Sequence, residues 1–100
     1  MPKQPEGFTD MSHAVVLQVK LHDLPTEEGD QMLKEVVIPN AKAQSGFQRG
    51  IWMRTTDHDG LGVVVFDTEK NAEAAMSALK PPPGGPELLS STVYEVGAEA

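Results

Sequence analysis

The order in which hydrophobic periods follow one another constrains this 100-residue chain more than any single motif. Apolar residues alternate with a period of two over residues 13–21, 47–55, 61–67 and 91–98. Residues 26–43 and 68–80 instead repeat apolar side chains at helical spacing. This order predicts an α+β fold, the ferredoxin-like βαββαβ sandwich, in which an antiparallel four-stranded sheet carries two helices on one face.

Length and composition indicate one domain, which we place at residues 13–98. Residues 1–12 contain two prolines, a glycine and no hydrophobic period, and they are predicted to form a flexible arm. Met11 is an alternative natural start, and the sequence leaves this choice open.

The charge balance excludes two classes of partner. Fifteen acidic residues against eight basic ones give a net charge of −7, whereas a nucleic-acid surface needs a basic stripe. The same acidity argues against an anionic membrane surface, and the apolar runs are shorter than the roughly 20 residues of a bilayer span. The chain has no cysteine, which suits a cytoplasmic location.

The first helix is expected to begin with Thr26 as its cap and with two acids in its first turn. Its predicted buried stripe consists of Met32, Leu33, Val36 and Val37. Pro39 interrupts the pattern, so we expect a kinked or broken helix that resumes to about Gln44.

The second helix has the clearest pattern in the chain. Asp67 or Thr68 is the expected cap. The predicted buried stripe consists of Ala72, Ala75, Met76 and Leu79. Residues 81–86 are rich in proline and glycine, so they are predicted to form a semi-rigid linker to the last strand.

The alternating strands predict which residues share a face of the sheet. On the first strand, the residues expected to pack on the helices are His13, Val15, Leu17, Val19 and Leu21. The third strand is apolar on both sides, which is typical of a central strand. The face away from the helices is expected to expose Val16, Gly50, Trp52, Gly62, Val64 and Phe66. An apolar patch of this size favours a homodimer joined through the sheets, and a monomer with this face open is the alternative.

Trp52 and Arg54 are the strongest candidate ligand-binding residues. They lie two apart on one strand, so both side chains point to the same face, which we expect to be the one away from the helices. A tryptophan beside an arginine can bind a flat anionic ligand, such as a small aromatic acid. Alternatively, Trp52 packs in the dimer core and Arg54 pairs with Glu95 or another acid. Tyr94 and Glu95 point to opposite faces of the last strand; we include Glu95 as a third ligand-binding candidate, although the sequence does not decide its face.

Three segments together resemble a known family over residues 13–98. They are Ser45-Gly46-Phe47 before a strand, residues 62–66 running into a capped helix with Asn71-Ala72-Glu73-Ala74-Ala75, and the closing Val93-Tyr94-Glu95-Val96. The chain is similar to the antibiotic biosynthesis monooxygenase-like group of the dimeric α+β barrel superfamily. The resemblance implies a homodimer whose sheets pair in a barrel, an aromatic pocket, and cofactor-independent oxygenation of aromatic polyketides.

No metal or organic cofactor is expected. Asp57, His58 and Asp59 are adjacent in a predicted hairpin turn, where they are expected to be solvated, and His13 and His22 flank one strand too far apart to share a ligand. Some relatives degrade haem with an Asn, a Trp and a His, but the spacing here does not bring Asn40 near a histidine. Catalytic residues stay unassigned. Two function classes stay open, a cofactor-independent monooxygenase and a non-catalytic dimeric module that binds a small ligand or has a structural role.

Overall fold

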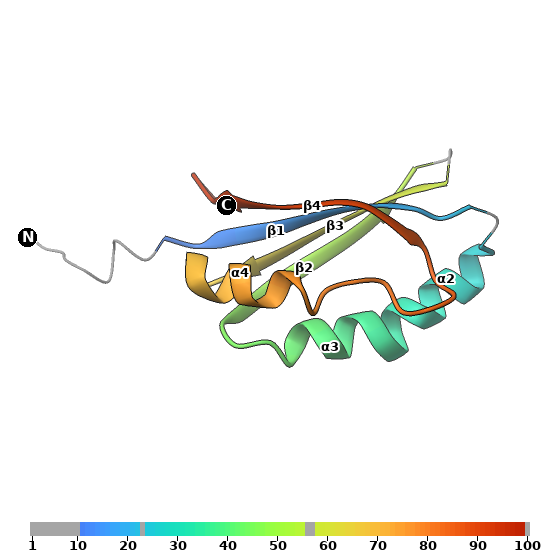
Figure 1. Ribbon diagram of the computed structural model, residues 1–100, viewed down its shortest axis with the longest axis horizontal. Helices are drawn as coiled ribbons and strands as arrows, with labels where there is room; N and C mark the ends of the chain where they lie inside the picture. Colours follow the sequence, from blue (N-terminus) through green and yellow to red (C-terminus); the bar gives the residue numbers. More distant parts are fainter. Residues whose placement is uncertain (1–10, 23, 56–57, 100) are drawn as a thin grey trace, which may run out of the picture.

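The chain forms an α+β fold with helices on one face of an antiparallel sheet. The computed structural model describes residues 11–22, 24–55 and 58–99. Its elements are β1 (His13–Lys20), α2 (Thr26–Met32), η1 (Leu33–Val37), α3 (Ile38–Lys42), β2 (Phe47–Arg54), β3 (Asp59–Phe66), α4 (Glu69–Met76) and β4 (Glu87–Glu95). The four strands lie in the order β2-β3-β1-β4, and every neighbouring pair is antiparallel. Both helical stretches lie against the same face of the sheet (Figure 1). The predicted α+β class is confirmed, and the architecture is consistent with a ferredoxin-like sandwich.

The first helix is continuous, so of the two predicted forms, kinked or broken, the broken one is wrong. Segments α2, η1 and α3 follow each other without a gap from Thr26 to Lys42. The middle segment η1 is a π-helix, in which the Ile38 N–H donates to the carbonyl of Leu33, five residues back. This wide turn ends just before Pro39, which has no N–H to donate and would collide with the carbonyl four residues earlier in a regular helix.

The wide turn also changes which side chains of the first helix are buried. Val36, predicted to lie in the buried stripe, is 46% exposed, while Ala41 is fully buried. A π-turn adds a residue to the repeat, so side chains within it and after it rotate away from a regular 3.6-residue stripe. The expected cap is also different: Pro25 occupies the N-cap position and Thr26, the first helical residue, makes no side-chain cap.

The boundaries of the last helix and strand also differ from prediction. Helix α4 ends at Met76 rather than Lys80, and β4 begins at Glu87 rather than residue 91. A register shift opposite Gln18 and Val19 interrupts the alternation of β4 near Leu89. Since a bulge places two residues opposite one, it hides the period-two pattern from which the strand start was read.

The start of α4 is tied to the start of β2. The Thr68 hydroxyl oxygen accepts a hydrogen bond of 3.1 Å from the Asn71 N–H, which confirms Thr68 as the cap. The Asn71 side-chain amide donates to the Asp67 carboxylate at 2.8 Å. The Asp67 N–H donates to the Gly46 carbonyl at 2.9 Å, so the loop before β2 lies directly against this cap.

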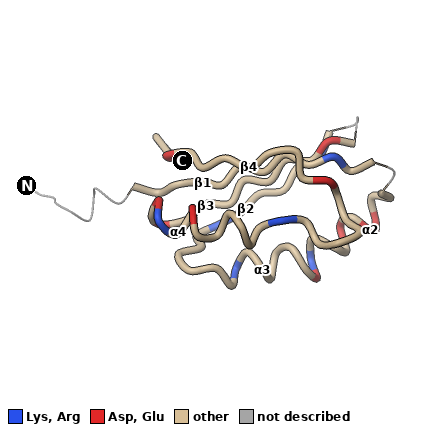
Figure 2. Tube along the Cα trace, in the orientation of Figure 1, with Lys and Arg blue, Asp and Glu red and all other residues tan. Residues whose placement is uncertain are grey.

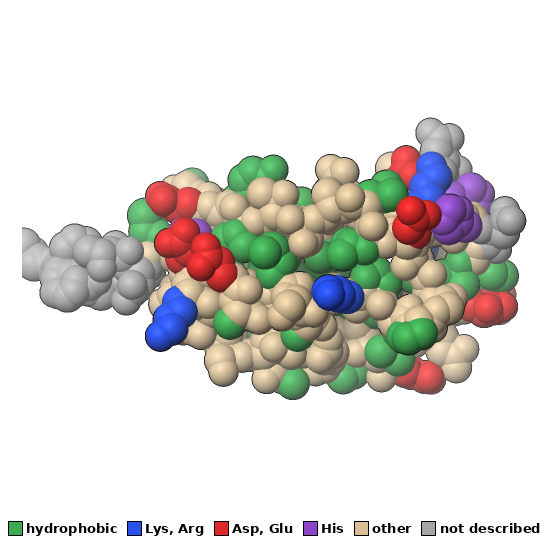
Figure 3. Space-filling model, in the orientation of Figure 1, with side chains coloured by type: hydrophobic (Ala, Val, Ile, Leu, Met, Phe, Trp, Pro, Cys, Tyr) green, Lys and Arg blue, Asp and Glu red, His purple; other side chains and the backbone are tan. Residues whose placement is uncertain are grey.

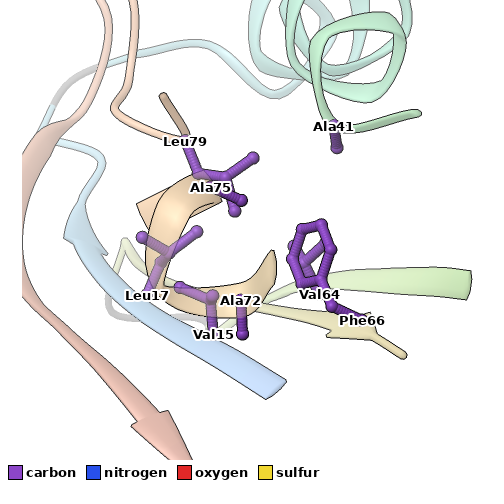
Figure 4. Close-up of a cluster of buried hydrophobic side chains, with 8 residues drawn as sticks. All are labelled: Val15, Leu17, Ala41, Val64, Phe66, Ala72, Ala75 and Leu79. Atoms are coloured by element: carbon purple, nitrogen blue, oxygen red, sulfur yellow. The ribbon is translucent and has the colours of Figure 1, made fainter. Parts of the chain in front are cut away.

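The core lies between the sheet and the two helical stretches, with α4 supplying most of the helical part (Figure 4). Its buried members are Val15, Leu17, Val64 and Phe66 from the strands, Ala72, Ala75 and Leu79 from the α4 region, and Ala41 from α3. The small alanines allow α4 and α3 to approach the sheet closely, and Phe47 packs edge-on against Phe66 with ring centroids 6.4 Å apart. The stripe predicted for the second helix is confirmed for Ala72, Ala75 and Leu79.

The predicted assignment of sheet faces is wrong for β2 and β3. Gly50, Trp52, Gly62, Val64 and Phe66 were expected on the face away from the helices. Pairing across the sheet aligns Val64 with buried Val15, Gly62 with Leu17 and Trp52 with Gly62, so these residues face the helices. Alternation shows which residues share a face but not which face is covered, and β3 is apolar on both sides.

The face away from the helices, here called the open face, carries a different apolar set. It consists of Val16, Ile51, Met53, Leu61, Val63, Val65, Leu89 and Tyr94. Ile51, Met53, Leu89 and Tyr94 are each between 46% and 56% exposed. Strands β1, β3 and β4 carry charged residues only at their ends (Figure 2). The open face is therefore apolar over β2 and β3 and is continued over β1 and β4 by the polar residues Gln18, Ser90 and Thr92; of its apolar members only Val16 was predicted.

Candidate functional site

A cleft of about 460 Å³ opens between the helix-covered face of the sheet and the first helix. Its floor comes from the end of β1 and from β2 and β3, and its opposite wall comes from α2 and η1. Residues 80–82 and Pro86 contribute the remaining side. Hydrophobic side chains are exposed along the seam between the sheet and the helices (Figure 3). The cleft has the size and apolar character of a small-molecule site.

Trp52 forms part of the floor of this cleft and also packs against the core. Its indole lies over two glycines: a Cβ added to Gly62 would come within 3.0 Å of Trp52 Cδ1, and one added to Gly50 would come within 2.6 Å of Cη2. The indole can lie flat along the sheet only because both neighbouring positions lack a side chain. A flat aromatic surface is thus presented to the cleft.

Arg54 lines the same cleft at the end of β2. Its guanidinium binds Asp30 of α2 through two contacts, Nη1 to Oδ1 at 2.8 Å and Nη2 to Oδ2 at 3.4 Å. The predicted pairing of Trp52 with Arg54 on one face agrees with the structure, but that face is the helix-covered one. Arg54 is paired with an acid other than Glu95, as one alternative allowed.

Glu95 lies far from the other two candidates. It pairs across the sheet with His13, at the end of β1 opposite the cleft, and it belongs to the edge strand β4. Trp52 and Arg54 belong to the other edge strand, β2. The structure therefore does not bring Glu95 together with Trp52 and Arg54. Tyr94, its neighbour, lies on the open face.

Two further polar residues of the cleft were not singled out as ligand-binding candidates. His58, expected in a solvated hairpin turn, lines the cleft, and its carbonyl accepts a 2.8 Å hydrogen bond from the Leu21 N–H. Lys80 lines it from the linker side. The sequence signal for Lys80 was the proline-rich linker. A stiff segment that returns from α4 to the sheet must cross one end of the space between the helices and the sheet. Asp57, from the same predicted turn, lies outside the described residues.

The remaining candidates have structural partners elsewhere. His13 Nδ1 lies 2.6 Å from the carbonyl of Met11, and His22 contacts Glu87 at 2.9 Å beyond the other end of β1. Asp59 pairs with Lys20 at 2.9 Å. The Asn40 side-chain amide donates to the Ala78 carbonyl at 2.7 Å and so joins α3 to the end of α4. No three His, Asp or Glu side chains within the described ranges are grouped as a metal site would require.

The structure describes the predicted N-terminal arm, residues 1–12, only from Met11 onward. Residues 1–10 of the predicted arm lie outside the described residues, whereas Ser12 is bonded to the sheet. Its carbonyl accepts the Val96 N–H at 2.9 Å, and its hydroxyl donates to Gln48 at 3.1 Å.

Comparison with known proteins identifies no family for this chain. No model of a known protein family matches the sequence, and a search of curated proteins gives no significant match. Within the described part of the chain, none of the helices has the length and apolarity to cross a bilayer.

Proposed function

We propose that the protein is a homodimeric enzyme of the antibiotic biosynthesis monooxygenase-like group, which oxygenates an aromatic, polyketide-like small molecule without a cofactor. The observation that carries the proposal is the cleft beside Trp52. A fully packed interior would have favoured a purely structural module instead. The resemblance of residues 13–98 to that group supplies the reaction class, and the absence of cysteine supports a cytoplasmic location.

In this proposal the substrate lies with its ring system against Trp52 and with an oxygen substituent toward Arg54. The cationic guanidinium stabilises the anion formed when a CH₂ of an electron-rich ring loses a proton to solvent water, and the peroxide formed later takes a proton back from solvent. That carbanion reacts with O₂ to form a peroxide at the ring carbon. Loss of water from the peroxide converts a ring CH₂ to a carbonyl, so one oxygen atom enters the product and the other leaves as water. The apolar walls shelter the anion and the peroxide from bulk water.

The dimer of this proposal is formed by the open faces of two copies. A sheet face of four strands, each eight or nine residues long, measures roughly 500 Å² at a strand spacing of about 4.8 Å and a rise of about 3.3 Å per residue. Two such faces together reach the roughly 1,000 Å² that a specific interface needs. The bordering charges already have partners within the chain, as Lys20 pairs with Asp59 and Arg49 with Glu99. An apolar patch, here over β2 and β3, with polar residues beside it is the usual organisation of an interface.

A non-catalytic dimeric module that binds a small ligand is the second candidate. It is favoured by the lack, among the described cleft residues, of two hydrogen-bonded side chains that could act as an acid–base pair. The ion pair of Arg54 with Asp30 beside this cleft bridges β2 and α2.

Oxygen uptake with 1,8-dihydroxyanthrone separates the two candidates. We expect saturable O₂ consumption, formation of the corresponding quinone, and weaker binding in Trp52→Phe. Val36→Ala is the matched control, because Val36 is exposed and lies outside the cleft. Saturable binding of the anthrone without O₂ uptake above the uncatalysed rate would favour the non-catalytic module, and absence of binding would contradict both.

A further inference from the structure

The charges around the cleft are opposite to those of the chain as a whole. The protein carries fifteen acidic residues and a net charge of −7. None of the described residues that line the cleft is acidic, whereas Arg54 and Lys80 are both basic. An apolar cleft with a cationic wall favours ligands that combine a hydrophobic body with a negative group.

Arg54 already binds a carboxylate, but the residue that supplies it does not itself line the cleft. Asp30 belongs to α2, and its side chain and that of Arg54 are 44% and 43% exposed. No residue of α2 is buried. An ion pair with this exposure stabilises the fold only weakly, by up to about a fivefold change in an equilibrium. Another carboxylate can therefore replace Asp30 on the guanidinium without loss of the fold.

We infer that the ligand of this cleft is an amphipathic aromatic anion, whose carboxylate replaces Asp30 on Arg54 while its ring lies over Trp52. This inference rests on the cleft of the proposed function and adds the charge of the ligand. Asp30 is then an internal competitor: it occupies the planar two-point site of Arg54 when no ligand is bound, and it sets how strongly an anion must bind. Lys80 adds a second positive charge to the wall, and it makes no ion pair with a described residue.

Two probes of nearly equal shape test the inference, 2-naphthoate and its neutral amide, 2-naphthamide. The chain has a single tryptophan, so the indole N–H of Trp52 gives one separate NMR resonance whose shift reports binding at the cleft. We expect 2-naphthoate to bind at least about tenfold more tightly than 2-naphthamide, as a hydrogen-bonded charge pair allows.

Four variants assign the difference to named side chains. Arg54→Met should remove the preference for naphthoate, and Arg54→Lys should keep only part of it because an ammonium cannot bind a carboxylate in the planar two-point form. Asp30→Asn should strengthen naphthoate binding several-fold by weakening the competitor. Arg49→Met is the matched control: it removes the other arginine of β2, which lies outside the cleft, and should leave both affinities unchanged. Naphthamide affinity should stay constant in all four and shows that the cleft is intact.

The outcomes distinguish this inference from the proposed function. Equal binding of the acid and the amide would overturn the inference and leave the cleft as a site for neutral ligands. Unchanged naphthoate affinity in Asp30→Asn would overturn the competition by Asp30. If neither probe shifts the Trp52 resonance, the cleft is not a ligand site, and both the inference and the proposed function fail.

Discussion

The indole of Trp52 rests on the backbone of Gly62, its cross-strand partner, so closely that a Cβ at position 62 would lie 3.0 Å from Cδ1 and 3.1 Å from Nε1. The two residues form the floor of the cleft together. The missing side chain of one residue therefore determines where the ring of the other can lie.

Gly62→Ala should displace the indole. Position 62 is buried, and the added methyl group would force Trp52 to shift toward the cleft. We expect a loss of stability of about 1–3 kcal/mol, as for other overpacked sites, together with a changed Trp52 emission maximum. Gly97→Ala is the control, since a Cβ there meets nothing within 4 Å. Denaturant unfolding and fluorescence spectra of both variants measure the two effects; an unchanged emission maximum in Gly62→Ala would contradict this geometry.

Ile51→Asp should dissociate the proposed dimer. Ile51 is 56% exposed on the open face, so an aspartate there is solvated in a monomer but would be buried without a partner in a dimer. Val36→Asp is the control, because Val36 is 46% exposed on the helical layer. Light scattering should give twice the 10.8 kDa chain mass for the native protein and for Val36→Asp, and the single chain mass for Ile51→Asp. A native protein at the single chain mass at micromolar concentration would refute the dimer.

The fold class could be predicted because strand and helix periods are properties of local sequence. Val15 and Leu17 alternate cleanly, and Ala72 and Ala75 lie on one side of a regular helix, so their burial followed from spacing alone. The spacing of residues in β2 did not show which face of this strand the helices cover. Ile51 and Met53 are as apolar as many core residues, while the covered face of the strand holds Gly50 and a partly exposed Trp52.

The candidate site shows the same division between local and long-range information. Trp52 and Arg54 lie two apart on one strand, and that spacing is enough to place both on one face. Glu95 could not be placed, because its distance from Trp52 depends on the strand order and on which end of each strand meets the cleft. The contribution of Lys80 depends on the path of the linker, which no periodic pattern encodes.

Thr68→Ala should destabilise the protein, whereas Thr26→Ala should not. The Thr68 hydroxyl accepts the Asn71 N–H at the start of α4, and loss of such a cap costs about 1 kcal/mol. Thr26 opens α2 after Pro25 and makes no cap hydrogen bond, so it is a matched control at the other helix start. Urea unfolding midpoints measure the difference, and equal midpoints for the two variants would show that the Thr68 cap contributes nothing.

Gly46→Ala should cost more than Gly84→Ala, although the two glycines have nearly the same backbone conformation. Their φ angles are +80° and +82°, so alanine is strained by a similar amount at both, about 1–2 kcal/mol. A Cβ at Gly84 meets nothing within 4 Å, whereas one at Gly46 would collide with the Asp67 carboxylate and the Asn71 amide. These two side chains hydrogen-bond each other at the start of α4. The collision adds about 1–3 kcal/mol to the backbone strain. Urea unfolding of both variants isolates this added cost, because the backbone strain cancels between them. Equal losses of stability would mean that the contact between the loop before β2 and the start of α4 does not constrain the fold.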